Sequence, residues 1–467
     1  MNRLSTGAPG LSSGEVARKA VHIGIGLLAL LIPWLTRWQG LAICGAAFFL
    51  NWLVLPRITH HLLEREDERR RGYSEGILEY PLSVGALFLL FGSRMPVVAA
   101  AWAILAFGDG FATIVGRTVR GPRLPWNHDK TISGFAAFVM VGGVAASAMY
   151  LWAAQAGIEE SPASLGGVVA LCFAAALFGA VLESLETGIN DNVSVPLMSG
   201  AFLFALTHAD PTTLAARSDR LLWNLEVGFV VNLIVSVLAW RARTVKPSGA
   251  IMGFVIGTFT WTFGGWQAFA ILLIFFVLGS GATRVGYQQK LARKIAQEEG
   301  GRRGARHAVA NCGVPAFLAF MAASTAQTDL FTIGLVAALA TAVFDTVSSE
   351  IGQVYGRHPF LITTFRRVPP GTDGAVSVEG TLAGLAAAVV LAAAGLGLGM
   401  MGEAGWVGAG LAVAGAFVGT TVESYLGAAT LGAVGEAISR IDNEAMNFAN
   451  TLVGAMAAMA LALLVLN

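Results

Sequence analysis

The chain has 467 residues, of which 55% are hydrophobic and 13% charged, and its mean hydropathy is +0.67. This composition excludes an ordinary water-soluble domain and predicts an all-α integral membrane protein that crosses the bilayer many times. The net charge of +1 indicates no particular partner, and the three cysteines lack the spacing of a metal site or a disulfide framework.

Apolar windows predict about fifteen transmembrane helices, several of them shorter than a full crossing requires. We expect the first window to be a retained helix, because no small-residue cleavage site follows it. The windows are 20–36, 40–56, 77–93, 96–115, 133–152, 165–187, 194–208, 223–240, 249–264, 266–283, 308–324, 329–348, 376–398, 404–424 and 446–466.

The charges of the loops predict the orientation. Basic loops are retained on the cytoplasmic side, and a cytoplasmic N-terminus places every strongly basic segment there. We therefore expect a multi-pass protein of the inner or plasma membrane whose active sites face the cytoplasm. The basic segments are 57–71, 117–130, 241–246, 284–306 and 357–367.

The order of polar motifs repeats once along the chain, which indicates two divergent halves of one plan. The distance from the first acid to the second is 74 residues in one half and 78 in the other (183 − 109 and 423 − 345). We predict a cytoplasmic segment at 1–19 and membrane domains at 20–212 and 213–467. The matched motifs are Asp109 with Asp345, 131–134 with 377–380, Glu183 with Glu423, and Asp191-Asn192 with Asp442-Asn443.

In the first half, Asp109 lies within an apolar run, where a carboxylate is a functional candidate by default. The alternative is a structural aspartate paired with Arg117. Carboxylates with a cation and glycines nearby suit a Mg²⁺-nucleotide, since phosphoryl transfer depends on positioning and charge neutralisation. We predict Asp109, Glu183 and Asp191 as metal ligands or bases. Lys130 is predicted as a catalytic residue that meets the phosphates, and the predicted phosphate-binding residues are Arg117, Thr131, Ser133, Gly134 and Asn192.

In the second half, Asp345, Glu350 and Glu423 are the candidate catalytic acids, with Asp345 and Glu423 as metal ligands. The denser basic loop of this half suits an acceptor that already bears a phosphate, although topology alone also explains the arginines. The predicted phosphate-binding residues are Arg302, Arg303, Arg366, Arg367, Gly371, Thr372, Asp373 and Gly374.

Three further residues are candidates for contact with the substrate. Arg18 and His22 lie one turn apart and share a face of the first helix. His128 lies beside Lys130 in the basic loop. For His22, a hydrogen bond between packed helices is the alternative role.

Two known families resemble the two halves. Residues of about 15–210 carry Arg18-Lys19-x-x-His22, Asp109-x-x-Ala112-x-x-x-Gly116-Arg117, Lys130-Thr131-x-x-Gly134, Glu183 and Asp191-Asn192-x-x-Val195-Pro196. These motifs resemble the phytol kinase and dolichol kinase family, which is related to the CDP-diacylglycerol synthases and phosphorylates isoprenoid alcohols with CTP.

From about residue 220 onward the chain is similar to the membrane family that contains phytyl-phosphate kinase. The motifs are Arg284-x-Gly286-Tyr287-x-x-Lys290, Gly301–Arg306, Ala310-Asn311, Asp345-Thr346-x-x-Ser349-Glu350-Ile351-Gly352 and Pro370–Gly374. One departure is Glu423-Ser424, where that family has an Asp-Ser pair; the acid is retained.

The resemblance implies a natural fusion in which one half phosphorylates phytol or a similar prenol and the other adds a second phosphate. CTP and Mg²⁺ are the implied donor and cofactor, the bilayer supplies the lipid substrate, and the diphosphate would enter tocopherol, quinone or chlorophyll synthesis. The alternatives are a cytidylyltransferase that forms a CDP-lipid, and a lipid or ion transporter with repeated halves and membrane acids.

Overall fold

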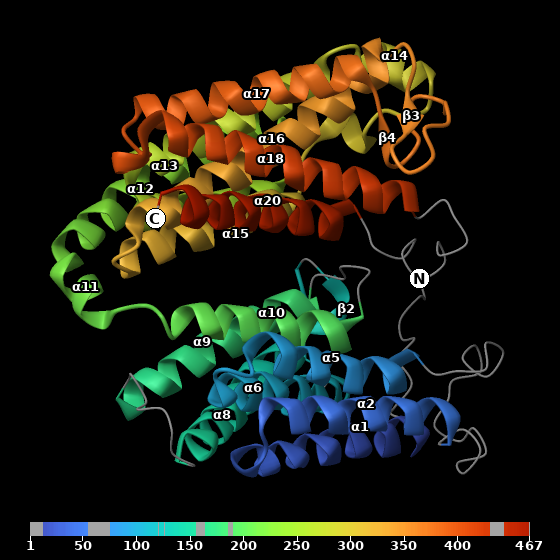
Figure 1. Ribbon diagram of the computed structural model, residues 1–467, viewed down its shortest axis with the longest axis vertical. Helices are drawn as coiled ribbons and strands as arrows, with labels where there is room; N and C mark the ends of the chain where they lie inside the picture. The colour runs from blue at the N-terminus through green and yellow to red at the C-terminus, as the bar shows by residue number, and fades with distance from the viewer. Residues whose placement is uncertain are drawn as a thin grey trace, which may run out of the picture. The chain divides into compact units, whose positions relative to one another are not determined.

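The computed structural model describes residues 13–54, 75–119, 121–125, 127–155, 164–184, 190–429 and 443–466 (Figure 1). The chain divides into two compact units, residues 1–208 and 209–467, called unit 1 and unit 2 below. Asp442 and the basic segment 57–71 of the sequence analysis lie outside the described residues.

Unit 1 is a helical bundle with one small hairpin. Its helix α2 begins with a capping box between Thr36 and Gln39, and its helix α6 has Pro96 in the first turn, where the missing N–H costs nothing. The elements are α1 (Ser13–Gly26), η1 (Leu27–Trp34), α2 (Arg37–Leu53), α5 (Glu75–Phe91), α6 (Met95–Ala103), η2 (Ile104–Asp109), α7 (Gly110–Thr118), β1 (Arg123–Leu124), β2 (Asn127–Thr131), α8 (Ile132–Gln155), α9 (Leu165–Ser184) and α10 (Asp191–Leu206).

Unit 2 is a bundle of longer helices packed around α16, which contacts α13, α15, α17, α18 and α20. Its elements are α11 (Pro211–Ala216), α12 (Ser218–Arg241), α13 (Pro247–Arg284), α14 (Tyr287–Ala292), η3 (Glu298–Gly301), α15 (Ala305–Ser324), α16 (Thr328–Tyr355), β3 (Phe360–Leu361), β4 (Ala375–Val376), α17 (Val378–Gly397), η4 (Gly402–Ala404), α18 (Gly405–Ala429) and α20 (Asn443–Val465).

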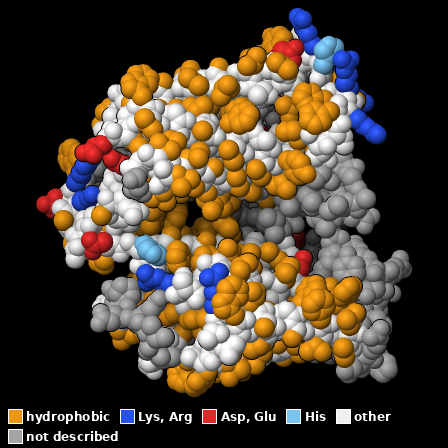
Figure 2. Space-filling view, in the orientation of Figure 1, with side chains coloured by type: hydrophobic (Ala, Val, Ile, Leu, Met, Phe, Trp, Pro, Cys, Tyr) orange, Lys and Arg blue, Asp and Glu red, His pale blue; other side chains and the backbone are white. Residues whose placement is uncertain are grey.

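The helices confirm the expected class, an all-α protein built to cross a membrane. Among the described residues, ten helices are long and apolar enough to cross, and two shorter apolar helices lie at 76–91 and 191–206. Hydrophobic side chains cover much of the visible surface, and charged ones gather in a few patches (Figure 2). The count of about fifteen spans and the cytoplasmic N-terminus stay predictions.

Helix α13 reverses direction at Gly265. Its 38 residues would extend about 57 Å if straight, almost twice the hydrocarbon thickness of a bilayer. Gly265 instead has φ 73° and ψ −178°, a conformation that only glycine adopts readily. Both ends of α13 then meet one residue, Arg303: the Lys246 N–H donates to its carbonyl, and its guanidinium donates to Thr283. The windows predicted at 249–264 and 266–283 are thus two separate helices.

The two units share a packing motif. In unit 1, α7 and α8 cross so closely that a Cβ on Gly116 would lie 2.9 Å from Thr131 Oγ1 and 3.4 Å from the Cα of Gly134. In unit 2, α16 and α17 cross at Gly352, where a Cβ would lie 2.9 Å from Ser377 Oγ. A short antiparallel hairpin precedes the second helix of each pair. The repeat read from the motifs therefore extends to helix packing.

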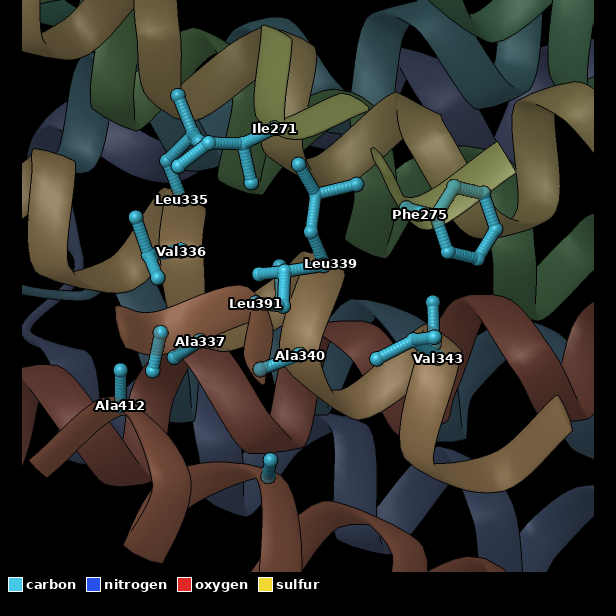
Figure 3. Close-up of a cluster of buried hydrophobic side chains, with 14 of the residues drawn as sticks. Ile271, Phe275, Leu335, Val336, Ala337, Leu339, Ala340, Val343, Leu391 and Ala412 are labelled. Atoms are coloured by element: carbon cyan, nitrogen blue, oxygen red, sulfur yellow. The ribbon is translucent and has the colours of Figure 1, made fainter. Parts of the chain in front are cut away.

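The core of unit 2 is made of side chains from α13, α15, α16, α17, α18 and α20. Ile271 and Phe275 of α13 face Leu339 and Val343 of α16, and Leu391 of α17 closes the cluster (Figure 3). These side chains fix the helices whose ends carry the acids of this unit.

Candidate active sites

Asp109 ends a π-helical segment inside an otherwise α-helical run. The segment η2 joins α6 to α7 without a break, and the Asp109 side chain is buried. A π-helical turn inserts an extra residue into an α-helix and changes its hydrogen bonds from i→i+4 to i→i+5. Such turns are frequent at functional sites. Sequence periodicity gives no sign of it.

Two side chains of α1 meet Asp109. Lys19 Nζ lies 2.7 Å from Asp109 Oδ2, and His22 Nε2 lies 3.5 Å from the same oxygen. The His22 imidazole also contacts the Leu105 carbonyl at 3.1 Å and the edge of the Tyr80 ring, with 4.9 Å between ring centroids. Asp109 is thus a paired carboxylate. The alternative prediction was an ion pair with Arg117, whereas the structure shows the ion pair with Lys19.

Lys19 belongs to this candidate site although it was not predicted as a site residue. The segment 1–19 was expected to be a cytoplasmic extension, whereas Lys19 belongs to α1 and reaches Asp109. The available signal was its place in the Arg18-Lys19-x-x-His22 motif, one turn before His22 on the same helix.

Lys130 joins the other two acids of unit 1. Its ammonium lies 2.6 Å from Glu183 Oε1 and 3.6 Å from Asp191 Oδ2, and it also donates to the Glu183 carbonyl. Burial alone would lower the pKa of Lys130, but the Glu183 and Asp191 carboxylates outweigh it and raise that pKa. Asp109 also interacts electrostatically with Lys130. We call Asp109, Lys130, Glu183, Asp191 and Lys19 the unit 1 cluster.

The hairpin and helix ends place these groups. The Asn127 amide donates to the Ser184 carbonyl at 3.0 Å, which holds strand β2 against the end of α9 and brings Lys130 to Glu183. The Thr131 hydroxyl accepts from the Gly134 N–H at 3.1 Å and from Ser133, so these three predicted phosphate-binding residues organise the start of α8.

The remaining predicted residues of unit 1 lie at its periphery. Asn192 Nδ2 contacts the Gly76 carbonyl at 3.5 Å. Arg117 and His128 are exposed, and Arg18 is half-buried on α1. Their predicted contacts with phosphate or substrate stay predictions.

In unit 2 three acids interact in series, and one of them, Asp345, also interacts with a cation. Asp345 of α16 and Glu423 of α18 interact electrostatically, and Glu423 also interacts with Asp373 in the β3–β4 loop. The guanidinium of Arg303 interacts with Asp345. Arg303 is half-buried, and this burial lowers the pKa of its guanidinium. We call Asp345, Glu423, Asp373 and Arg303 the unit 2 cluster.

Glu350, a predicted catalytic acid, forms an ion pair with a buried lysine. Lys290 and Glu350 form an ion pair with exposed fractions of 1% and 3%. Lys290 also donates to the Thr283 carbonyl at 2.8 Å, and the second carboxylate oxygen of Glu350 has no hydrogen-bond partner among the described residues.

The other predicted cations and glycines of unit 2 differ in exposure and in hydrogen bonding. Arg302 donates to the Val245 carbonyl at 3.3 Å, while Arg366 and Arg367 are exposed at the hairpin. Thr372 donates to the Pro369 carbonyl at 2.8 Å. Both loop glycines have positive φ, 88° at Gly371 and 69° at Gly374. At Gly374 a Cβ would overlap the backbone of α18.

The donor set of each unit fits a cation that arrives with phosphates. Among the described residues, no group of three or more His, Cys, Asp or Glu side chains is arranged to hold a metal ion by itself. Each unit nevertheless offers neighbouring carboxylates, Glu183 with Asp191 and Asp345 with Glu423. Mg²⁺ needs only one or two protein carboxylates when substrate phosphates and water supply the remaining oxygens.

Comparison with known proteins agrees with the motifs. Residues 230–455 match the family described as integral membrane protein DUF92. Protein VTE6, chloroplastic, of Arabidopsis thaliana is 36% identical over 233 residues, which are 49% of this chain and 68% of that protein. Phytol kinase of Synechocystis sp. is 33% identical over 216 residues, 44% of this chain and 83% of that protein.

Farnesol kinase, chloroplastic, of Arabidopsis thaliana is 30% identical over 217 residues, 43% of this chain and 68% of that protein. No solved structure gives a significant match. The expected resemblance to membrane kinases of isoprenoid alcohols is confirmed by these relatives.

Proposed function

The chain belongs to the DUF92 family of integral membrane proteins, and from this membership we propose that it is a kinase of membrane isoprenoid alcohols with one active site in each unit. Relatives named phytol kinase and farnesol kinase support the reaction class. The observation that carries the two-site proposal is a repeated set of groups: each unit has an aspartate, a glutamate from a later helix and a cation that interacts with these acids. Each unit also contains a close glycine crossing of two helices.

In unit 1 the proposed substrate is the alcohol, phytol or a similar prenol. Its hydroxyl oxygen would attack the terminal phosphorus of CTP as the bond from that phosphorus to the bridging oxygen breaks, releasing CDP. The hydroxyl proton would pass to a carboxylate, for which Asp109 and Asp191 are the candidates. Lys130 would move from Glu183 and Asp191 toward the phosphates, because an ammonium neutralises charge that accumulates on them.

In unit 2 the proposed substrate is the lipid monophosphate made in unit 1. An oxygen of its phosphate would attack the terminal phosphorus of a second CTP, so that a diphosphate and CDP result. Asp345 and Glu423 would hold the Mg²⁺ that accompanies the nucleotide, as Glu183 and Asp191 would in unit 1. The bound metal supplies positive charge to the phosphates.

The test is a product assay with separated steps. Purified protein in detergent receives Mg²⁺, CTP or ATP, and either phytol or phytyl phosphate, and lipid products are resolved by mass. We expect Asp109→Asn to abolish only the conversion of phytol to its monophosphate, and Asp345→Asn only the conversion of monophosphate to diphosphate. Asp329→Asn is the matched control, because Asp329 lies at the other end of the helix that carries Asp345.

Three results would contradict the proposal. A CMP-lipid product would indicate a cytidylyltransferase. Loss of both steps in each single variant would indicate one shared site. No product with any prenol or nucleotide would remove the kinase assignment and favour transport.

A further inference from the structure

The backbone of Arg303 is held on both sides by the segment that precedes α13. The Lys246 N–H donates to the Arg303 carbonyl at 2.9 Å, and the Arg303 N–H donates to the Thr244 carbonyl at 3.4 Å. Val245 and Arg303 form an isolated parallel bridge. The backbone from which the Arg303 side chain extends is therefore fixed. The backbones of Arg366 and Arg367 are also bonded at the hairpin, but their side chains are exposed, whereas that of Arg303 is half-buried.

The side chain of Arg303 extends toward α13 and α16, near Thr283 and Thr346. Nη2 lies 3.5 Å from Thr283 Oγ1 of α13. A Cβ on Gly279 would lie 3.5 Å from Arg303 Nη2 and 3.6 Å from the methyl group of Thr346, which follows Asp345. Gly279 thus leaves the space in which the guanidinium reaches α16 beside Asp345.

Among the residues that the structure describes, the Arg303 guanidinium uses one of its donors, on Thr283. The group carries five N–H donors in a planar fork that matches two oxygens of a phosphate. Among the described residues, Thr283 Oγ1 is the one side-chain hydrogen-bond acceptor seen for Arg303, and Asp345 and Glu350 act on it electrostatically.

The buried ion pair Lys290–Glu350 stabilises Thr283, the residue that Arg303 contacts. Lys290 donates to the carbonyl of Thr283, the residue whose hydroxyl receives Arg303. Glu350 lies on α16, so the pair ties α14 to α16 and to the end of α13. Because Lys290 is 1% exposed and paired with Glu350, it has no exposed ammonium to offer a ligand.

We propose that Arg303 is a preformed binding residue for a phosphate dianion in unit 2, and that Lys290 and Glu350 are positioning residues that hold it, rather than catalytic groups. The inference rests on the proposed function of unit 2. Two phosphates share this chemistry, the monophosphate of the lipid acceptor and the terminal phosphate of the nucleotide, and the experiment separates them.

The experiment measures binding to the full-length protein in detergent by titration calorimetry. One probe is phytyl monophosphate, and the other is a CTP analogue with a non-hydrolysable β–γ linkage and Mg²⁺. The variants are Arg303→Gln, Arg303→Lys and the double variant Lys290→Met/Glu350→Gln. Arg357→Gln is the matched control, since Arg357 is an exposed arginine of the same unit outside the cluster.

We expect Arg303→Gln to weaken one probe by about 10- to 100-fold, the loss of a charge-assisted hydrogen-bonded contact, and to leave the other within about twofold. Arg303→Lys should recover part of the affinity, because a point charge replaces the fork. The probe that loses affinity identifies the phosphate. The double variant should weaken the same probe while the Arg303 side chain is intact.

Unchanged affinity for both probes in a folded Arg303→Gln protein would overturn the binding role. Unchanged affinity in the double variant would overturn the positioning role. The kinase proposal fails separately: wild-type protein that binds both probes but transfers no phosphate would contradict the function and leave the Arg303 site standing.

Discussion

The Lys290–Glu350 ion pair allows a stringent test, because both side chains are almost completely buried, at 1% and 3% exposure. Removing one partner leaves a charge in a place with no water to stabilise it. Replacing both by uncharged side chains of similar length removes the unpaired charge altogether. Lys290→Met, Glu350→Gln and the double variant, with the wild type, therefore form a double-mutant cycle.

The expected magnitudes follow from the surroundings. Breaking a buried ion pair costs about 3–5 kcal/mol, whereas replacing it as a whole is often close to neutral. After Lys290→Met the Glu350 carboxylate still feels Arg303, so we expect a loss near 3 kcal/mol, roughly the lower limit. After Glu350→Gln the Lys290 ammonium retains the Thr283 carbonyl, so a loss of about 3–4 kcal/mol is expected.

The double variant should lose no more than about 2 kcal/mol of unfolding free energy. The two single losses sum to at least about 6 kcal/mol, so the coupling energy between the residues should be at least about 4 kcal/mol. The assay is the free energy of unfolding, from denaturant titration in mixed micelles followed by tryptophan fluorescence. If the two single losses add to the double loss within about 0.5 kcal/mol, the residues do not form a buried pair and the reasoning is wrong.

Three further predictions concern the two clusters and one helix cap. Lys130→Met should reduce phosphorylation of the alcohol by about 100- to 1,000-fold, because it removes the cation between Glu183 and Asp191, and should leave phosphorylation of the monophosphate unchanged in the product assay. Gly374→Ala should lower the unfolding midpoint more than Gly399→Ala: both glycines have positive φ, but only at Gly374 would a Cβ meet backbone, and equal shifts would contradict this packing. Hydrogen bonds from Thr213 and Thr212 lower the pKa of Asp210 from 3.8 to about 2. The folded-state pKa is the lower one, so the stabilisation by this carboxylate is present above pH 3.8 and is lost as the pH falls through about 2. Asp210→Asn should flatten that part of the acid-unfolding curve, and an unchanged curve would exclude the cap as its source.

The class of fold and the places of the helices follow from local composition. A run of apolar residues specifies a helix in a membrane whatever it packs against, since every backbone polar group must be satisfied within the segment. The break between 249–264 and 266–283 was predictable in the same way, because Gly264 and Gly265 interrupt the run. The π-helical segment before Asp109 was not, because the helices that pack against it, α1, α8, α9 and α10, are brought there by tertiary structure.

The partners of the acids depend on tertiary packing, which a single sequence does not give. Asp109 was identified from its apolar surroundings, but its cation, Lys19, comes from a helix that the sequence places far away. Lys290 belongs to a strongly basic loop, and its burial against Glu350 becomes visible only when α14 lies on α16. The choice among candidate cations in unit 2 is therefore a structural result.

The reversal of α13 also has a consequence for how the protein enters its membrane. Since both ends of α13 meet at Arg303, the basic segments 241–246 and 284–306 lie at the same end of the unit 2 bundle. With the predicted cytoplasmic N-terminus, neither segment would have to be carried across the bilayer. The two arms of α13 can enter the lipid together as a hairpin, with their flanking arginines and lysines left behind. Gly265 thus keeps the two basic segments that flank α13 on a common side before any of the later helices has been made.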